Sequence, residues 1–183
     1  WASRADGFDG WFGPVRATTA AVCLAAVCGL GWMAWRQSSV WHDSVSAWTA
    51  MIERNPRFHM GYYNLAAAYK RNGDVDTAVQ AYEQAIVLYP HYPEANVNLG
   101  NILRQRGDLR GAVQRYRTSL RGRPDFHMAH MNLGSTLIQL GQANEAIPHL
   151  ERAAAGARKA GDTQRAESIE RQLRKMRGRA ASP

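Results

Sequence analysis

Three stretches of the chain align without gaps and decide the fold: YNLAAAYKRNGDVDTAVQAYEQAIVLYP (residues 63–90), VNLGNILRQRGDLRGAVQRYRTSLRGRP (97–124) and MNLGSTLIQLGQANEAIPHLERAAAGAR (131–158). Each is offset from the next by 34 residues. The positions shared by all three are Asn64, Asn98 and Asn132; Leu65, Leu99 and Leu133; Gly73, Gly107 and Gly141; and Ala78, Ala112 and Ala146. A fixed period of this length predicts stacked helical hairpins, because one hairpin cannot bury its apolar face alone.

The recurring residues each have a physical role in such a hairpin, and the middle stretch illustrates them. Gly107 follows the first helix, where a left-handed C′ position favours glycine. Asp108 comes next and is expected to cap the second helix. Ala112 is small where the two helices cross, Leu99 is expected to fill the groove between neighbouring hairpins, and Pro124 closes the second helix.

The spacing and residue types resemble the tetratricopeptide repeat family. Three full repeats are legible, at residues 59–92, 93–126 and 127–160. Residues 37–58 fit a degenerate half-repeat, the junction, in which Pro56 keeps the phase. The resemblance implies an all-α solenoid whose first helices line a concave face.

The C-terminal end of the chain is predicted to be a cap. Residues 161–177 fit an amphipathic capping helix, because their apolar residues step by three and four. These apolar residues are Ala166, Ile169, Leu173 and Met176. The opposite face is polar and charged, as the outer side of a terminal helix must be. Residues 178–183 are expected to form a frayed tail.

An uncharged run near the start predicts an N-terminal transmembrane helix over residues 17–36. Arg16 and Arg36 bracket the nineteen residues ATTAAVCLAAVCGLGWMAW. As a helix this run would rise roughly 28 Å, close to the thickness of a bilayer core. Trp32 and Trp35 lie at one end, where indole rings favour the headgroup region. A buried core helix or the core of a signal peptide is the alternative.

Small residues recur every four positions in this predicted span, which residues 1–16 would flank. They are Ala17, Ala21, Ala25 and Gly29. Because small residues at this spacing let another helix approach closely, the segment is expected to pack against other membrane helices as well as lipid. The expected localisation is therefore the membrane, with a single span in this chain.

The formal charge of +8 and the pI near 10 suggest nucleic acid, anionic lipid or an acidic partner. Residues 101–123 hold seven Arg against one Asp and residues 171–179 hold five basic residues without an acid, which leaves −3 for the rest. A nucleic-acid groove would need stacking aromatics, and Tyr116 is the only aromatic residue in the first stretch. No nucleic-acid partner is expected. A solvated outer face is favoured, with anionic lipid or an acidic subunit as the alternative.

No pattern in the sequence indicates catalysis, a cofactor or a metal. Phosphate-binding loops, dinucleotide fingerprints and zinc spacings are absent from the sequence. His127 and His130 are three residues apart, but no third ligand is evident, and zinc sites usually have three or four protein ligands. The chain is therefore predicted to have no catalytic residue, no metal and no cofactor.

The strongest binding feature is the asparagine series. Asn64, Asn98 and Asn132 occupy the same place on first helices, which line the concave face in the resembled family. An Asn amide offers a donor and an acceptor and so can bracket a peptide backbone, and asparagines at this position hold extended polypeptide in related repeats. The same groove would be lined by Tyr63, Asn101, Arg104, Met131 and Ser135. The alternative is that these asparagines pack adjacent repeats together.

The junction carries a second resemblance. Directly after the predicted membrane helix come Arg36, Trp41, Asp43, Trp48, Asn55, Pro56, Tyr62, Tyr63, Asn64 and Leu65. This order, over roughly residues 16–65, is similar to the C-terminal part of multispanning GT-C type glycosyltransferases with repeat tails, such as O-mannosyltransferases. The resemblance implies repeats on the periplasmic or lumenal side. The catalytic acids of such enzymes lie in early loops that have no counterpart in this sequence.

Together these observations predict a membrane-anchored scaffold that binds a protein or peptide partner beside a membrane. Two alternatives stay open: the substrate-handling C-terminal part of a polytopic glycosyltransferase, and an accessory subunit of a larger membrane complex. Further hydrophobic spans upstream of Trp1 would favour the enzyme, and a nearby start codon would favour the subunit.

Overall fold

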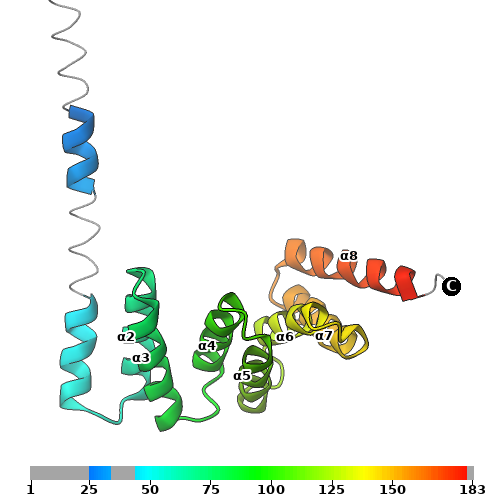
Figure 1. Cartoon of the computed structure of the whole chain (residues 1–183), viewed down its shortest axis with the longest axis horizontal. Helices are drawn as coiled ribbons and strands as arrows, with labels where there is room; N and C mark the ends of the chain where they lie inside the picture. Colours follow the sequence, from blue (N-terminus) through cyan, green and yellow to red (C-terminus); the bar gives the residue numbers. More distant parts are fainter. Residues whose placement is uncertain (1–24, 34–43, 181–183) are drawn as a thin grey trace, which may run out of the picture. The chain divides into compact units, whose positions relative to one another are not determined.

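The computed structural model describes residues 25–33 and 44–180 and divides the chain into two compact units, residues 1–44 and 45–183. In the first unit the described residues form one helix over 25–33, and every one of its side chains is exposed. The second unit is all-α in its described part and holds the repeats (Figure 1).

The membrane part of the predicted fold class is wrong, and so is the predicted membrane localisation. Within 25–33 and 44–180, no helix has both the length and the apolarity needed to cross a bilayer. The described residues of the predicted span, 25–33, rise about 13 Å as a helix, against a hydrocarbon core of roughly 30 Å. Alanine and glycine supply four of its nine residues, which lowers its apolarity. The rest of the predicted span lies outside the described residues.

The predicted packing of this segment against other membrane helices loses its basis as well. It rested on Ala17, Ala21, Ala25 and Gly29, and the first two lie outside the described residues. The expected contacts with lipid and the periplasmic or lumenal placement depended on the same span and are withdrawn with it.

The second unit begins with a helix over 44–54 and continues as a series of helical hairpins (Figure 1). The helices of the series are α2 (His59–Arg71), α3 (Val75–Leu88), α4 (Pro93–Gln105), α5 (Leu109–Gly122), α6 (His127–Gln139), α7 (Ala143–Lys159) and α8 (Thr163–Ala180). Hairpin partners are α2 with α3, α4 with α5 and α6 with α7, and each hairpin packs on the next through α3 with α4 and α5 with α6. The array is a helical solenoid.

The turns inside the hairpins confirm the roles predicted for glycine and aspartate. Gly107 has φ +86°, which glycine adopts without steric cost. Asp108 Oδ1 then accepts the Gly111 N–H at 2.8 Å and caps α5. A fourth turn of the same kind, Gly161 with φ +79° followed by Asp162, leads into α8. The array therefore closes with one more hairpin turn between α7 and α8.

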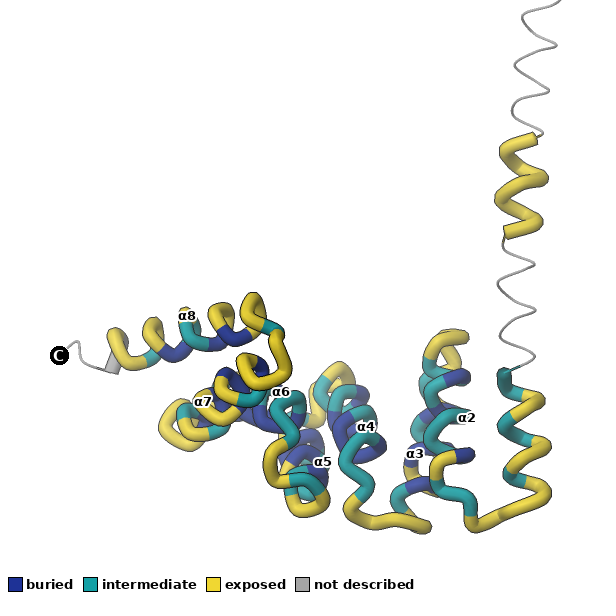
Figure 2. The backbone as a smooth tube through the Cα atoms, turned by 180° about the vertical axis from the view of Figure 1, so that it is seen from behind, coloured by how far each residue is buried: buried dark blue, intermediate teal, exposed yellow. Residues whose placement is uncertain are grey.

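Close helix crossings depend on small residues. The alanine shared by all three repeats is completely buried in each of them. At Gly100 in α4, a Cβ would lie 2.7 Å from the Tyr116 ring of α5, and at Gly134 in α6 it would lie 2.7 Å from Leu150 of α7. Large side chains fill the space beside these glycines. Figure 2 shows the buried positions on the facing sides of neighbouring helices.

Helix α8, in the place predicted for a capping helix, packs on α7. Its buried residues Ala166, Ile169 and Leu173 lie on one face, and the last two pack with Leu150 of α7 in one apolar cluster. The opposite face of α8 is exposed (Figure 2). The helix continues to Ala180, past the end predicted at residue 177.

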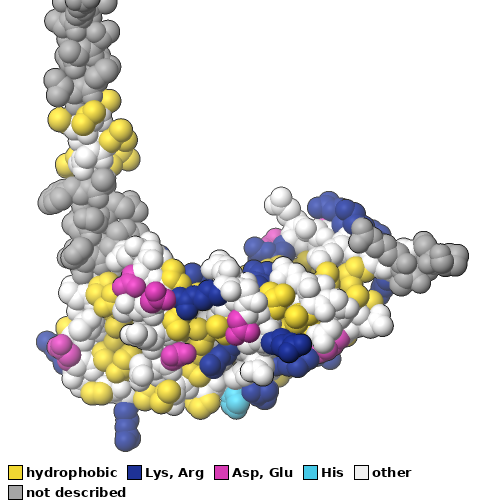
Figure 3. All heavy atoms as spheres, in the orientation of Figure 1, with side chains coloured by type: hydrophobic (Ala, Val, Ile, Leu, Met, Phe, Trp, Pro, Cys, Tyr) yellow, Lys and Arg dark blue, Asp and Glu magenta, His cyan; other side chains and the backbone are white. Residues whose placement is uncertain are grey.

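Several arginines of the basic stretch 101–123 form ion pairs. Arg106 with Asp76 and Arg117 with Glu145 bridge neighbouring repeats, and Arg123 pairs with Glu94 inside the second repeat. Basic and acidic groups are accordingly interspersed over the surface seen in Figure 3. Because these pairs are largely exposed, each contributes at most about 1 kcal/mol to stability. They neutralise part of the net positive charge of residues 101–123.

Candidate functional site

The residues predicted to bind a peptide lie on the first helices of three successive repeats. Helix α2 carries Tyr63 and Asn64, α4 carries Asn98, Asn101 and Arg104, and α6 carries Met131, Asn132 and Ser135. All are half-buried except Asn132, which is only 7% exposed. We call these eight residues the first-helix row.

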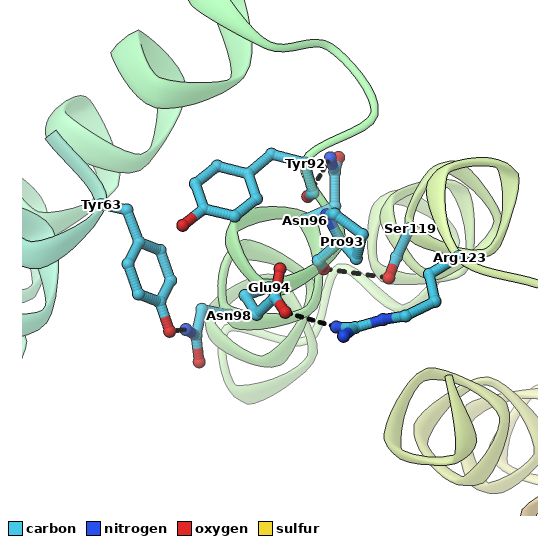
Figure 4. Close-up of polar contacts among 8 residues, drawn as sticks. All are labelled: Tyr63, Tyr92, Pro93, Glu94, Asn96, Asn98, Ser119 and Arg123. Carbon is cyan, nitrogen blue, oxygen red and sulfur yellow. Dashed lines mark hydrogen bonds and ion pairs between the residues drawn. The ribbon is translucent and has the colours of Figure 1, made fainter. Parts of the chain in front are cut away.

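Tyr63 and Asn98 connect the first two repeats within this row. The Asn98 Nδ2 group donates to the Tyr63 hydroxyl at 3.4 Å (Figure 4). The Tyr63 ring lies against two other aromatic rings, with centroid distances of 5.8 Å to Tyr82 and 5.2 Å to Tyr92. Burial raises the pKa of Tyr92 to about 12, so its hydroxyl stays protonated at physiological pH. The contact fixes the Asn98 amide, and no described residue donates to its Oδ1.

Asn101 connects the second and third repeats. Its Oδ1 accepts the Tyr116 hydroxyl at 2.8 Å and the Asn132 amide at 3.0 Å. Burial raises the pKa of Tyr116, with Arg104 opposing the shift, so this hydroxyl is a stable donor. With its oxygen occupied twice, Asn101 keeps its amide N–H groups without a described acceptor. The buried Asn132 positions Asn101.

The three asparagines that are equivalent in sequence are thus not equivalent in structure. Asn98 contacts the preceding repeat through Tyr63, and Asn132 contacts it through Asn101. The Asn64 side chain has no hydrogen bond to any described residue. The sequence period alone could not reveal this, because the partners lie at other positions of the preceding repeat.

A second set of polar contacts, which the sequence reasoning missed, holds the turns between repeats. The Asn96 amide donates to the carbonyls of Pro90 (3.1 Å) and Tyr92 (2.9 Å), and His130 Nε2 bonds the carbonyl of Pro124 at 2.9 Å. The available signal was the spacing, since the 34-residue offset relates both the two donors and the two prolines. Figure 4 shows Asn96 beside this turn, together with the pair Glu94–Arg123.

The buried His130 in α6 pairs with the half-buried His149 in α7. Their rings are stacked, with centroids 5.2 Å apart, and their Nδ1 atoms are 3.0 Å apart. A carbonyl only accepts, so His130 Nε2 carries a hydrogen. In the neutral ring His130 Nδ1 is then the acceptor, and His149 Nδ1–H donates to it. Burial lowers the pKa of both imidazoles, which favours this neutral pair.

Comparison with known proteins agrees with the repeat architecture. Residues 60–92 and 97–163 match the tetratricopeptide repeat, and the two matches together cover just over half of the chain. The chain belongs to the tetratricopeptide repeat family. These matches begin at residue 60, so they do not show the resemblance of residues 16–65 to membrane glycosyltransferases.

Solved structures show the same fold. A crystal structure of MamA has a TM-score of 0.57 at 15% identity, over 80% of this chain and 94% of that one. A second MamA structure has a TM-score of 0.56 at 21% identity, over 66% of each chain. At these identities the likeness concerns the fold. No curated protein matches the chain.

The third tetratricopeptide repeat contains a pocket outside the first-helix row. It has a volume of about 640 Å³ and lies between the turn before α6, the start of α6 and the C-terminal half of α7. Its lining residues are Pro124, Asp125, His127, His130, Arg152, Ala155, Gly156, Lys159 and Ala160. Within 25–33 and 44–180 no group of three His, Cys, Asp or Glu residues is placed to hold a metal ion.

Proposed function

We propose that this chain is a protein-binding scaffold that holds an extended segment of its partner along the first-helix row. Its tetratricopeptide repeats support a role in protein–protein interaction. The finer assignment, to the row on α2, α4 and α6, is the proposal.

One observation carries the assignment: α4 presents an acceptor and a donor that no described residue uses. They are the Oδ1 atom of Asn98 and the amide N–H groups of Asn101. The two residues are three apart on one helix and therefore share a face. An extended peptide backbone needs both kinds of group, since each residue carries one N–H and one C=O.

The cross-repeat hydrogen bonds make this pair rigid before a partner arrives. Tyr63 holds the Asn98 amide, and Tyr116 and Asn132 hold the Asn101 carbonyl. Ordering a polar side chain on binding costs free energy, so a pre-ordered amide binds more tightly than a free one. The half-buried Arg104 lies a further three residues along α4 and would favour a carboxylate in the partner.

The test is selection of displayed random peptides on the full chain, repeated with Asn98→Ala and with Asn144→Ala. Asn144 is an exposed asparagine in α7, outside the row, and so is the matched control. Peptides enriched on the wild-type chain should be retained by Asn144→Ala and lost by Asn98→Ala, with both variants melting as the wild type does. Peptides retained equally by both variants would place the binding surface elsewhere.

A further inference from the structure

The pocket in the third repeat exists because α7 carries small residues where α5 carries large ones. Residues 153–157 read AAAGA, and the equivalent residues 119–123 read SLRGR. In the second repeat, the Arg123 guanidinium lies 3.9 Å from the centre of the Phe126 ring and pairs with Glu94. The equivalent position in the third repeat is Ala157, which is completely buried and does not line the pocket. Ala155 replaces Arg121, lines the pocket and is exposed, so the space that a long side chain would take there is open.

The walls of this pocket are positively charged. Arg152 and Lys159 line it from α7, and Asp125 is the only carboxylate among its lining residues. Neither basic residue forms an ion pair with any described residue, whereas six other arginines of the array do. The pocket therefore holds two cations with room in front of them and a single acid to balance them.

His130 lines the same pocket without offering a free nitrogen. One ring nitrogen is used on the Pro124 carbonyl and the other on His149. The positive charge of Arg152 contributes to lowering the pKa of both imidazoles, which shows that its field reaches the wall that His130 forms. The groups left to contact a ligand are the cations of α7 and the ring of His127.

We propose that this pocket is an anion-binding site that takes a carboxylate or phosphate group between Arg152 and Lys159. The opposite charges supply the attraction, and the alanines and Gly156 supply the space. The site is separate from the first-helix row, because none of its lining residues belongs to that row. Its anion is carried either by a small molecule or by an acidic side chain of a protein.

Two probes distinguish these sources. Inorganic phosphate and a hexaglutamate peptide, with hexaglutamine as the uncharged twin of the peptide, are each titrated into the full chain while backbone amide shifts are recorded. Saturable shifts at Ala155, Gly156 and Lys159 are expected with at least one of the charged probes and not with hexaglutamine. Phosphate alone would identify a small anion, and hexaglutamate alone a protein carboxylate. If these amide shifts do not change with either charged probe, the proposal is wrong.

Variants give the decisive comparison. Lys159→Gln should weaken binding about fivefold, the upper range for a partly exposed ion pair, and Lys175→Gln, an exposed lysine in α8, should leave it unchanged. Ala155→Leu keeps both cations but fills the pocket and should abolish binding, while the melting temperature stays at the wild-type value because Ala155 is exposed. If Lys175→Gln weakens anion binding as much as Lys159→Gln does, or if Ala155→Leu still binds fully, the binding comes from general surface charge. Either result would contradict an anion site in this pocket. Either result leaves the proposal for the first-helix row untouched.

Discussion

At the residue scale, the side-chain oxygen Oδ1 of Asn101 shows how one side chain joins three helices. It accepts hydrogen bonds from Tyr116 of α5 and from Asn132 of α6, while Asn101 itself belongs to α4. The Tyr116 ring is fully buried and also fills the space beside Gly100. This hydroxyl therefore contributes to stability and to the orientation of a candidate binding group.

Removing the Tyr116 hydroxyl should show how much it contributes to stability. Tyr116→Phe keeps the ring but leaves one acceptor site of Asn101 empty, so we expect a loss of about 1 kcal/mol of unfolding free energy. Urea denaturation measures it. Tyr62→Phe is the control and should change stability little, because this tyrosine is half-buried and its hydroxyl has no hydrogen bond to a described residue. If Tyr62→Phe loses as much unfolding free energy as Tyr116→Phe, the hydrogen bond from Tyr116 to Asn101 does not account for the loss.

The pair His130 and His149 should make the array sensitive to acid. Because burial lowers the pKa of both imidazoles in the folded state, the unfolded chain binds protons more readily. This stabilisation is complete above the ordinary histidine pKa of about 6.5. It is lost as the pH falls from there through the lowered folded values. Arg152 and Arg117 strengthen the effect, and Asp125 and Glu145 oppose it.

Replacing His130 by the residue at the equivalent position of the second repeat tests this effect. His130→Asn can still donate to the Pro124 carbonyl, as Asn96 does to Pro90, but it removes one titrating group. When the pH is lowered from 7.5 to 5, the melting temperature should fall steeply for the wild type and less for the variant. Parallel curves would show that the pair does not control acid stability.

Residue-level prediction succeeded where a position has one local role and failed where the role depends on neighbours. Asp108 caps α5 as its place after a glycine predicted. The asparagine period, by contrast, did not predict that Asn132 would be buried on Asn101 while Asn64 has no such partner. Those contacts cross between repeats, and a pattern read along one chain does not specify them.

At the scale of the helix, two kinds of glycine hold the hairpins in place. Gly107 is needed for its backbone conformation, because a Cβ there would meet no atom within 4 Å but φ is +86°. Gly100 is needed for space, because its Cβ would lie 2.7 Å from the Tyr116 ring. The repeat period revealed the first kind, whereas the second became visible only once α4 lay against α5.

These glycines should respond differently to alanine. Gly107→Ala should cost about 1 kcal/mol, the strain of a non-glycine residue in the left-handed region. Gly100→Ala should cost about 1–3 kcal/mol, since the ring must move within a packed interface. Gly178→Ala, in the exposed last turns of α8, should be neutral or stabilising by up to about 1 kcal/mol. A destabilised Gly178→Ala or a neutral Gly100→Ala, measured by urea denaturation, would contradict these assignments.

At the scale of the whole second unit, stability is expected to spread from neighbour to neighbour, as in other stacked repeats. Helix α8 covers the last hairpin through Ile169 and Leu173, which pack with Leu150. Leu173→Ala should cost about 2–4 kcal/mol locally and speed amide exchange in α7 and α8 more than in α4. The exposed neighbour Arg174→Ala is the control. Uniform acceleration over all helices would show one cooperative unit instead.

At this scale, two sequence features led to misleading expectations: the basic excess and the apolar run near the start. Part of the basic excess over residues 101–123 is compensated by acids of adjacent repeats, through pairs such as Arg106 with Asp76. The uncharged run at 17–35 satisfied a length rule, but no helix among the described residues has both the length and the apolarity to cross a bilayer. The solenoid followed from the 34-residue period because many positions agree in phase. The prediction of a membrane span, by contrast, rested mainly on one observation, the absence of charge in a run.

The contact between Asn98 and the backbone of a bound segment can be measured by a double-mutant cycle on a selected peptide. Each backbone amide of the peptide is replaced in turn by an ester, which removes one N–H donor, and dissociation constants are measured for the wild-type chain and for Asn98→Ala. We predict one ester position that weakens binding to the wild type about fivefold, the size of a typical hydrogen bond. The same ester should have no effect on Asn98→Ala. If every ester weakens binding to both chains equally, Asn98 does not contact the peptide backbone and the account is wrong.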